Sequence, residues 1–264
     1  MLQDRKYKYN QTLIKRFTNG IDTRYKVITC KCLRTAGVED EADKGYVKRK
    51  EGEKCSESIS RTRSRIYELA FCNAWDWFFT ATLDPAKYER SDLERFHTSL
   101  TQWIRDYNKK HDLQIKFLLI PELHSDGKSW HMHGLLQGLP VDHLKQFVIG
   151  DIMGKKLAEK VRKGDIVFNW LAYANKFGFC DIEPIRSHEA VCKYITKYIS
   201  KSLDNSVKDL NAHMYYCSRG LNRAETIKKG TMFADIVPEF ENEYCAITWI
   251  DDEKVLQDIL DSIT

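Results

Sequence analysis

Two histidines separated by one residue are the first feature of the chain that could do chemistry. His131 and His133 flank Met132 in the segment 129–136, Ser-Trp-His-Met-His-Gly-Leu-Leu. In a β-strand alternate side chains point to the same face, so both imidazoles would lie on one side of a sheet. Imidazole nitrogens are common metal ligands, so the spacing predicts half of a metal site. For an isolated His-X-His, two half-buried structural histidines are the simpler interpretation.

A carboxylate at the end of the preceding predicted strand could complete this site. Residues 114–122 read as a strand that ends at Glu122, and a turn follows at Ser125-Asp126-Gly127. A hairpin of this kind would bring Glu122 near His131 or His133. Two imidazoles and one carboxylate, with positions left for water and substrate, suit Mg²⁺ or Mn²⁺ acting on a phosphate, and zinc is an alternative.

The segment 187–203 is predicted to be a helix that carries two tyrosine–lysine pairs. Tyr194 and Tyr198 are four residues apart and share one face, and Lys197 and Lys201 each follow a tyrosine by three residues. A phenol is a weak nucleophile at its usual pKa of about 10, and a nearby ammonium group or metal favours the phenolate. Beside a metal pair, this pattern suggests cleavage of a phosphodiester by a tyrosine. An ordinary amphipathic helix is the alternative.

The elements that would position these residues form an α+β pattern with an antiparallel sheet backed by helices. On the strand at 77–83, Thr80 and Thr82 share one face and apolar residues occupy the other, so the threonine face would line the site. A capping box at 91–94 opens the second helix. The predicted helices are 58–73, 91–107 and 187–203, with mostly helical segments at 141–163 and 165–176, and the predicted strands are 77–83, 114–122, 129–137, 179–185 and 212–218.

Composition excludes several other classes of protein. No apolar run approaches the roughly 18 residues of a membrane span, and the N-terminus has no apolar signal region, so we expect a soluble cytoplasmic protein. The eight cysteines are scattered and are expected to be reduced. Cys30, Cys32 and Cys55 could be three zinc ligands, but the spacing is unusual and no fourth ligand is evident.

Three short motifs follow one another in the order found in a known group of enzymes. They are Phe-Phe-Thr-Ala-Thr-Leu-Asp at 78–84, Trp-His-Met-His-Gly at 130–134, and Tyr-X-X-X-Tyr-X-X-Lys at 194–201. With them the chain resembles the HUH endonuclease superfamily, specifically the two-tyrosine initiators of rolling-circle replication in phages and plasmids. The resemblance covers roughly residues 58–220.

The resemblance implies both a fold and a mechanism. The fold is a sheet of about five antiparallel strands with the histidines on a central strand. The mechanism is attack of a tyrosine on a metal-bound phosphate of single-stranded origin DNA, which gives a 5′-phosphotyrosine and a free 3′-hydroxyl, and a second tyrosine allows alternating cleavage and rejoining. The implied metal ligands are His131, His133 and Glu122, and the implied catalytic residues are Tyr194, Tyr198, Lys197 and Lys201.

The expected partners are single-stranded DNA at a replication origin and proteins of a bacterial host. The chain has no Gly-Lys-Ser/Thr helicase signature, so a host helicase would unwind the DNA and a host polymerase would extend it. No membrane partner is expected. The residues expected to contact DNA are Thr80, Thr82, Arg61, Arg63, Arg65, Lys193, Arg219 and Arg223, with Trp130 or Tyr215 for stacking.

Charge is distributed unevenly along the chain. Residues 235–264 hold nine acidic residues and one basic residue, a net charge of −8, so the other 234 residues carry +12. A basic body suits a polyanion, and the acidic segment would compete with DNA or dock a replication partner. We therefore expect a polar, loosely packed arm at 1–56, the endonuclease domain at 57–234 and an acidic tail at 235–264.

Related functions remain open on the sequence alone. A two-tyrosine transposase or a plasmid-mobilising relaxase would use the same chemistry, although a transposase usually carries further DNA-binding domains. A non-catalytic origin-binding repressor could keep the fold, but the intact histidines and tyrosines argue against it. A histidine-triad nucleotide hydrolase would need another alternating histidine where the chain has Leu135.

Overall fold

The chain forms two compact units, residues 51–221 and residues 1–50 together with 222–264. The structure is a computed structural model, and side chains are described for all the residues it covers except 7–8, 34–35, 56–58 and 196–203. Among the described residues no helix is both long enough and apolar enough to cross a membrane. The described residues are 7–8, 11–30, 34–35, 56–203, 213–232, 236–241 and 245–264.

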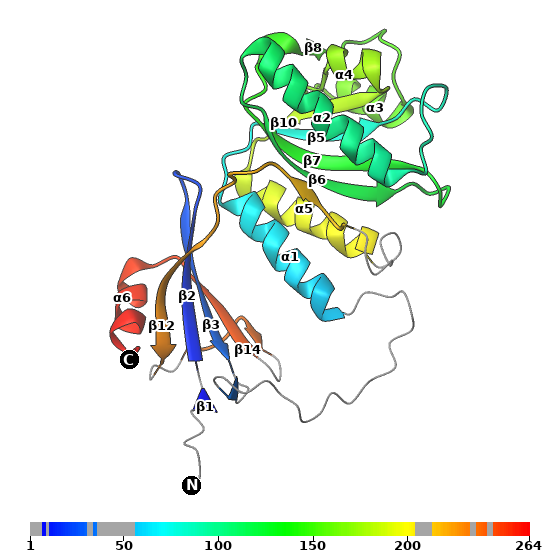
Figure 1. Cartoon of the computed structure of the whole chain (residues 1–264). Coiled ribbons are helices and arrows are strands. Elements are labelled where there is room, and N and C mark those ends of the chain that lie inside the picture. The colour runs from blue at the N-terminus through cyan, green and yellow to red at the C-terminus, as the bar shows by residue number, and fades with distance from the viewer. Residues whose placement is uncertain are drawn as a thin grey trace, which may run out of the picture. The chain divides into compact units, whose positions relative to one another are not determined.

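The larger unit is built on an antiparallel sheet (Figure 1). In its described residues the order across the sheet is β11-β6-β7-β5-β10-β9-β8. The four central strands have five to eight residues and the other three have two each, so the α+β class and the antiparallel sheet predicted from the sequence are confirmed and are consistent with an HUH/RRM-like fold. The strands are β5 (Trp77–Thr82), β6 (Lys116–Leu123), β7 (Trp130–Gln137), β8 (Lys145–Gln146), β9 (Phe168–Asn169), β10 (Cys180–Pro184) and β11 (Tyr216–Cys217).

Helices cover both faces of this sheet. α2 (Leu93–His111) packs its apolar stripe, which includes Phe96 and Leu100, against Phe79 and Met132 of one face. On the other face, Phe78 contacts α5 (His188–Leu203), and α5 in turn packs against α1 (Ser56–Phe71). The predicted helices at 58–73, 91–107 and 187–203 are therefore confirmed.

The start of α2 differs in detail from the predicted capping box. Asp92 is the N-cap residue, and its Oδ1 accepts a hydrogen bond from the backbone N–H of Arg95 at 2.9 Å. The hydroxyl of Ser91 instead donates to Glu89 Oε1 at 2.8 Å. Asp caps a helix as well as Ser does, so the carboxylate takes the position and the Ser91 hydroxyl bonds within the preceding loop.

The prediction of mostly helical structure at 141–163 is wrong for most of that segment. It contains a 3₁₀ turn, η1 (Val141–His143), the short strand β8, and one α-helix, α3 (Lys155–Arg162). Gly150 has a φ of +105°, which a right-handed helix cannot contain, and Ile152 is fully exposed. The apolar residues of this loop do not form a buried stripe. Residues 165–176 likewise divide into β9 and α4 (Leu171–Lys176).

The smaller unit is a second antiparallel sheet that joins the two ends of the chain. Its order within the described residues is β12-β2-β3-β14-β13, and α6 packs its buried Leu256 and Ile259 against Ile14 and Val27 of the sheet. The strand pair β1 (Tyr7–Lys8) and β4 (Arg34–Thr35) is separate. The remaining elements are β2 (Gln11–Thr18), β3 (Thr23–Cys30), β12 (Glu225–Thr231), β13 (Phe240–Glu241), β14 (Cys245–Ile250) and α6 (Glu253–Asp261).

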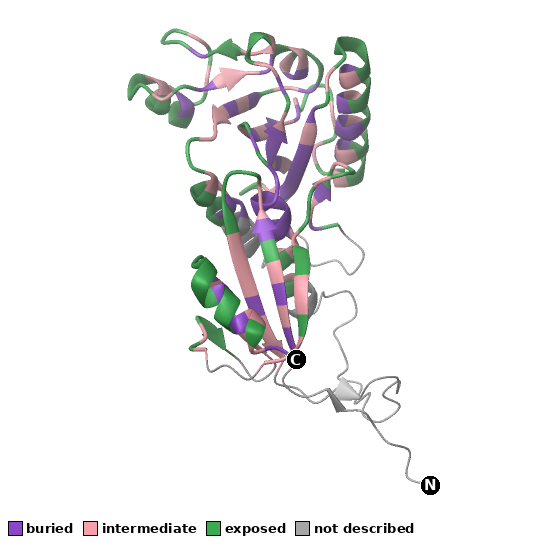
Figure 2. Ribbon diagram, turned by 90° about the vertical axis from the view of Figure 1, so that its left-hand side faces the viewer, coloured by how far each residue is buried: buried purple, intermediate pink, exposed green. Residues whose placement is uncertain are grey.

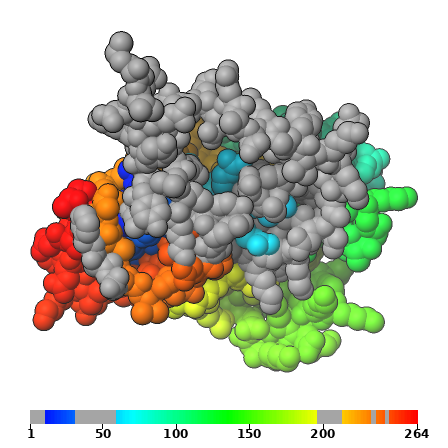
Figure 3. All heavy atoms as spheres, turned by 90° about the horizontal axis from the view of Figure 1, so that it is seen from below, coloured from blue at the N-terminus to red at the C-terminus, as the bar shows by residue number. Residues whose placement is uncertain are grey.

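Regular structure in this unit corrects the expectation of a loosely packed arm and a plain acidic tail. Residues 11–30 form two strands and residues 245–261 form a strand and a helix. The helix is amphipathic, with its acidic side chains on the exposed side, and Figures 2 and 3 show exposed atoms along the C-terminal segment. The functional boundaries 1–56, 57–234 and 235–264 stay a prediction.

Candidate active site

The two histidines lie on β7 and face away from α2. Met132 between them is fully buried in the opposite face, as strand alternation requires. Thr82 Oγ1 is hydrogen-bonded to His131 Nδ1 at 2.9 Å, and Thr80 Oγ1 lies 3.5 Å from His133 Nδ1. The two imidazole rings are nearly parallel, at an angle of 24°. Because Nδ1 of each ring faces a threonine, Nε2 of each is the nitrogen available for a ligand.

Glu122 lies beside both histidines. In the register of the β6–β7 hairpin it is paired with His131, and its Oε2 lies 2.6 Å from Nε2 of His133. Nε2 of His131 is buried and has no hydrogen-bond partner in the described part of the chain. A buried polar atom without a partner costs free energy, and a bound cation would remove that cost at this position.

The surroundings of His131 favour its neutral form. Burial, together with the positive fields of His124, His133 and Arg90, lowers the pKa of His131 to about 4. The His124 ring stacks on that of His131 with centroids 4.8 Å apart. Neutral imidazole is the form that binds metals, so the protonation state is suited to a ligand.

The donor set fits a divalent cation in kind. It offers two imidazole nitrogens and one carboxylate on the same sheet face. In the described residues no three His, Cys, Asp or Glu side chains are already grouped as a metal site. The direct contact between Glu122 and His133 would have to open for these three residues to share a cation.

Tyr194 connects the helix α5 to the histidine strand. Its ring packs edge-on against Phe78 with centroids 5.3 Å apart, and Phe78 in turn stacks on His133 at 6.2 Å. Tyr194 is 44% exposed, so its phenol can be reached from solvent. The neighbouring Ile195 is fully buried, so α5 presents different faces to the core and to solvent, as the sequence predicted.

The other predicted catalytic residues are less fully placed. Lys197, Tyr198 and Lys201 belong to α5, but their side chains lie outside the described part of the structure. Their backbone positions confirm the predicted helix, and their roles stay predictions.

Three charged residues near the site were missed by the sequence analysis. Asp181 on β10 is paired with Thr80, and burial raises the pKa of Asp181. Two residues on, Glu183 binds Lys160 of α3 through an ion pair of 2.7 Å. Burial opposes the charge of Lys160, but the hydrogen bond and charge of Glu183, and the fields of Asp181 and Tyr194, raise its pKa. Acidic residues alternating along the predicted strand at 179–185 were the signal that could have revealed them.

The basic residues predicted to contact DNA differ in their surroundings. Arg65 forms a 2.7 Å ion pair with Glu68, and Lys193 one of 2.6 Å with Glu189, each with a carboxylate of its own helix. Pairs of this kind are common on helix surfaces and do not by themselves mark a binding site. Arg61, Arg219 and Arg223 are exposed and Arg63 is half-buried.

Residues 76–203 match the family model of the replication-associated proteins of the ORF2 and gene II protein type. No curated protein and no solved structure matches the chain. The matched segment contains β5, β6, β7 and α5, and therefore His131, His133, Glu122 and both tyrosines. The match supports a rolling-circle replication initiator, a role that implies binding of DNA at an origin and suggests endonuclease activity.

Proposed function

We propose that this protein initiates replication by nicking and rejoining single-stranded origin DNA through a covalent tyrosine–DNA intermediate. The observation that carries the proposal is the arrangement of one sheet face. His131 and His133 are oriented there by threonines, Glu122 contacts one of them, and Phe78 links them to Tyr194. The family match to a replication-associated protein covers all of these residues.

In this proposal His131, His133 and Glu122 hold one divalent cation, Mg²⁺ or Mn²⁺. Such an ion, when bound, polarises a phosphate oxygen and neutralises its charge. The threonines keep both imidazoles turned so that Nε2 faces the site, and the low pKa of His131 keeps that nitrogen unprotonated.

The tyrosines supply the nucleophile. The phenol oxygen of Tyr194 or Tyr198 would attack the phosphorus, lose its proton, and displace the 3′-oxygen of the neighbouring nucleotide. The product is a 5′-phosphotyrosine and a free 3′-hydroxyl, and because the phosphodiester energy is kept, attack by a 3′-hydroxyl reverses the step. Lys197 and Lys201 would neutralise charge in the two half-reactions, and a host helicase and polymerase would act on the nicked DNA.

Covalent adduct formation tests the proposal. The full chain is incubated with Mn²⁺ and single strands that carry the origin, and the adducted peptide is mapped by mass spectrometry. Tyr194→Phe and Tyr198→Phe should each retain some cleavage and lose strand transfer, whereas the double variant should form no adduct because no phenol remains in the site. Tyr25→Phe, in the smaller unit, is the matched control and should behave as wild type.

Three results would contradict parts of this proposal. An adduct formed by the double variant would reject the tyrosine assignment. Origin binding without Mn²⁺-dependent nicking by the wild type would indicate a non-catalytic repressor. Transfer of the bound strand to unrelated target DNA would indicate a two-tyrosine transposase or a relaxase.

A further inference from the structure

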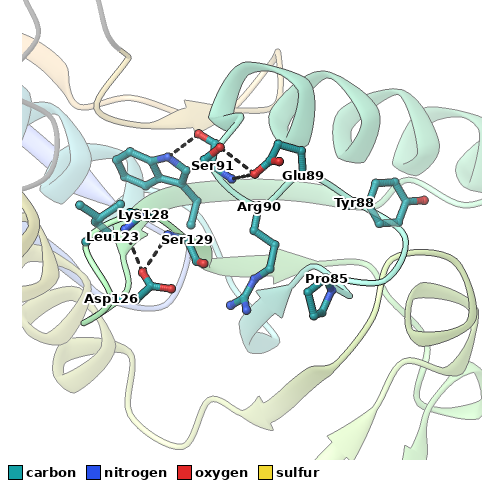
Figure 4. Close-up of a pocket in the computed structure, with 11 residues that line it drawn as sticks. Pro85, Tyr88, Glu89, Arg90, Ser91, Leu123, Asp126, Lys128 and Ser129 are labelled. Atoms are coloured by element: carbon teal, nitrogen blue, oxygen red, sulfur yellow. Dashed lines mark hydrogen bonds between the residues drawn. The ribbon is translucent and has the colours of Figure 1, made fainter.

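A cavity of about 640 Å³ lies beside the histidine strand (Figure 4). Two loops form its walls, the β5–α2 connection and the β6–β7 turn. The loops are held together where the backbone N–H of Trp130 donates to the carbonyl of Arg90 at 2.9 Å and the Trp130 indole donates to the carbonyl of Ser91 at 3.1 Å. The volume is within the roughly 300–1,000 Å³ of small-ligand pockets.

Arg90 is the side chain in this cavity that points to a ligand. Figure 4 shows its guanidinium extending from the β5–α2 loop into the space between the two walls. Its Nε is buried and has no hydrogen-bond acceptor in the described part of the chain. Buried charged donors are normally paired, so this group is short of an anion.

The carboxylates in the cavity wall are already occupied by their own loops. Asp126 accepts the backbone N–H groups of Lys128 and Ser129 at 2.9 and 2.8 Å. Glu89 accepts the hydroxyl of Ser91 at 2.8 Å and its N–H at 3.2 Å. These hydrogen bonds lower the pKa of both carboxyls, so each stays an anion that its loop has satisfied. Neither is hydrogen-bonded to Arg90.

The cavity is also close to the candidate metal ligands. Trp130 lines it and directly precedes His131 on β7, and the charge of Arg90 is near enough to His131 to help lower its pKa. A chain of phosphates that passes the histidines would therefore reach Arg90 as well. A planar guanidinium binds a phosphate through two parallel hydrogen bonds.

We infer that this cavity binds a nucleotide of the DNA strand next to the reacting phosphate, with Arg90 as the ligand of its backbone phosphate. The inference rests on the proposed function for the identity of the strand. Arg90 then acts as a positioning residue, since it fixes the register of the strand on the sheet. Lys128, exposed at the rim, adds a second positive charge.

Arg90→Gln tests the inference on the full chain, with Arg162→Gln as the matched control. Arg162 is exposed on α3 and does not line the cavity. Affinity for a fluorescent single-stranded oligonucleotide is measured by anisotropy in EDTA over a series of salt concentrations. Arg90→Gln should weaken binding about fivefold or more and reduce the slope of log K against log salt by about 0.7, the value for one single-strand phosphate contact. The control should keep the wild-type slope, and Arg90→Lys should recover the slope but only part of the affinity.

Two further measurements keep the result specific. An unchanged affinity and slope in Arg90→Gln would overturn the inference, as would a parallel loss of Mn²⁺ binding and thermal stability, which would indicate a structural role. Stabilisation of the wild type alone by inorganic phosphate, with no change in DNA binding, would assign the cavity to free phosphate and also overturn it. Adduct formation by the wild type is scored separately, so a failed nicking activity with a clear Arg90 effect would reject the proposed function and keep the cavity.

Discussion

Replacing Thr82 by valine should weaken metal binding and DNA cleavage much more than it weakens the fold. The hydroxyl of Thr82 is hydrogen-bonded to Nδ1 of His131 at 2.9 Å, and valine has nearly the same shape without the hydroxyl. This bond sets the orientation of the ring and keeps Nε2 directed at the site. Without it the imidazole can rotate, and Nδ1 loses a buried partner.

The expected magnitude follows from the hydrogen-bond geometry. Loss of one hydrogen bond should cost about 1 kcal/mol of unfolding free energy. Loss of an outer-shell partner of a metal-binding histidine typically costs 10- to 100-fold in metal affinity or activity, so we expect at least about a tenfold loss of Mn²⁺ affinity. The contact between Thr80 and His133 is 3.5 Å long, a weak hydrogen bond, so Thr80→Val should reduce Mn²⁺ affinity by only about two- to threefold.

The assay combines calorimetric titration of Mn²⁺, thermal unfolding and the yield of covalent adduct. Thr12→Val is the control for a purely structural loss, because Thr12 is buried and hydrogen-bonded to Thr29 at 3.1 Å in the smaller unit. It should lower stability and leave Mn²⁺ affinity unchanged. If Thr82→Val binds Mn²⁺ and forms adduct as the wild type does, the threonine does not position His131 and the reasoning fails.

Two substitutions test the packing that supports the site. A Cβ at Gly134 would lie 2.5 Å from the carbonyl oxygen of Leu118, so Gly134→Ala should lower the unfolding free energy by about 1–3 kcal/mol in urea titrations, whereas Gly154→Ala, in open space, should not; equal stability of the two variants would contradict the close packing of β6 and β7. Leu256→Ala should destabilise the smaller unit by about 2–5 kcal/mol, while Val255→Ala on the exposed side of α6 should have little effect; a near-neutral Leu256→Ala would mean that α6 does not belong to that core.

Local sequence pattern was sufficient for the central elements of the larger unit. Alternation predicted β5 and β7 with the correct residues on each face, because one side of the sheet is packed by α2 and the other carries polar groups. The hairpin was predictable because its turn at 125–127 is short, and it brings Glu122 to the histidines. The spacing of the apolar residues likewise predicted α2 and α5.

The smaller unit could not be predicted in the same way. β2 is paired with β12, about two hundred residues further along the chain, and no local pattern marks such a partner. Charged residues such as Lys15 and Arg16 interrupt the apolar alternation of β2, which made the segment resemble a polar arm. Acidic residues on the exposed side of α6 similarly hid its buried Leu256 and Ile259.

The separation of the two sheet faces explains why the motif has an apolar residue between its histidines. Met132 must fill the core under α2, because its neighbours on the pleat point to the opposite face, where the site lies. A polar residue at that position would be buried without a partner, and a one-residue shift of register would place both imidazoles in the core. The threonines of β5 obey the same constraint, since Ala81 between them is also fully buried. The rigidity of the ligands therefore comes from the packed face, and a core substitution at Met132 should disturb the metal ligands as directly as a change of Thr82 would.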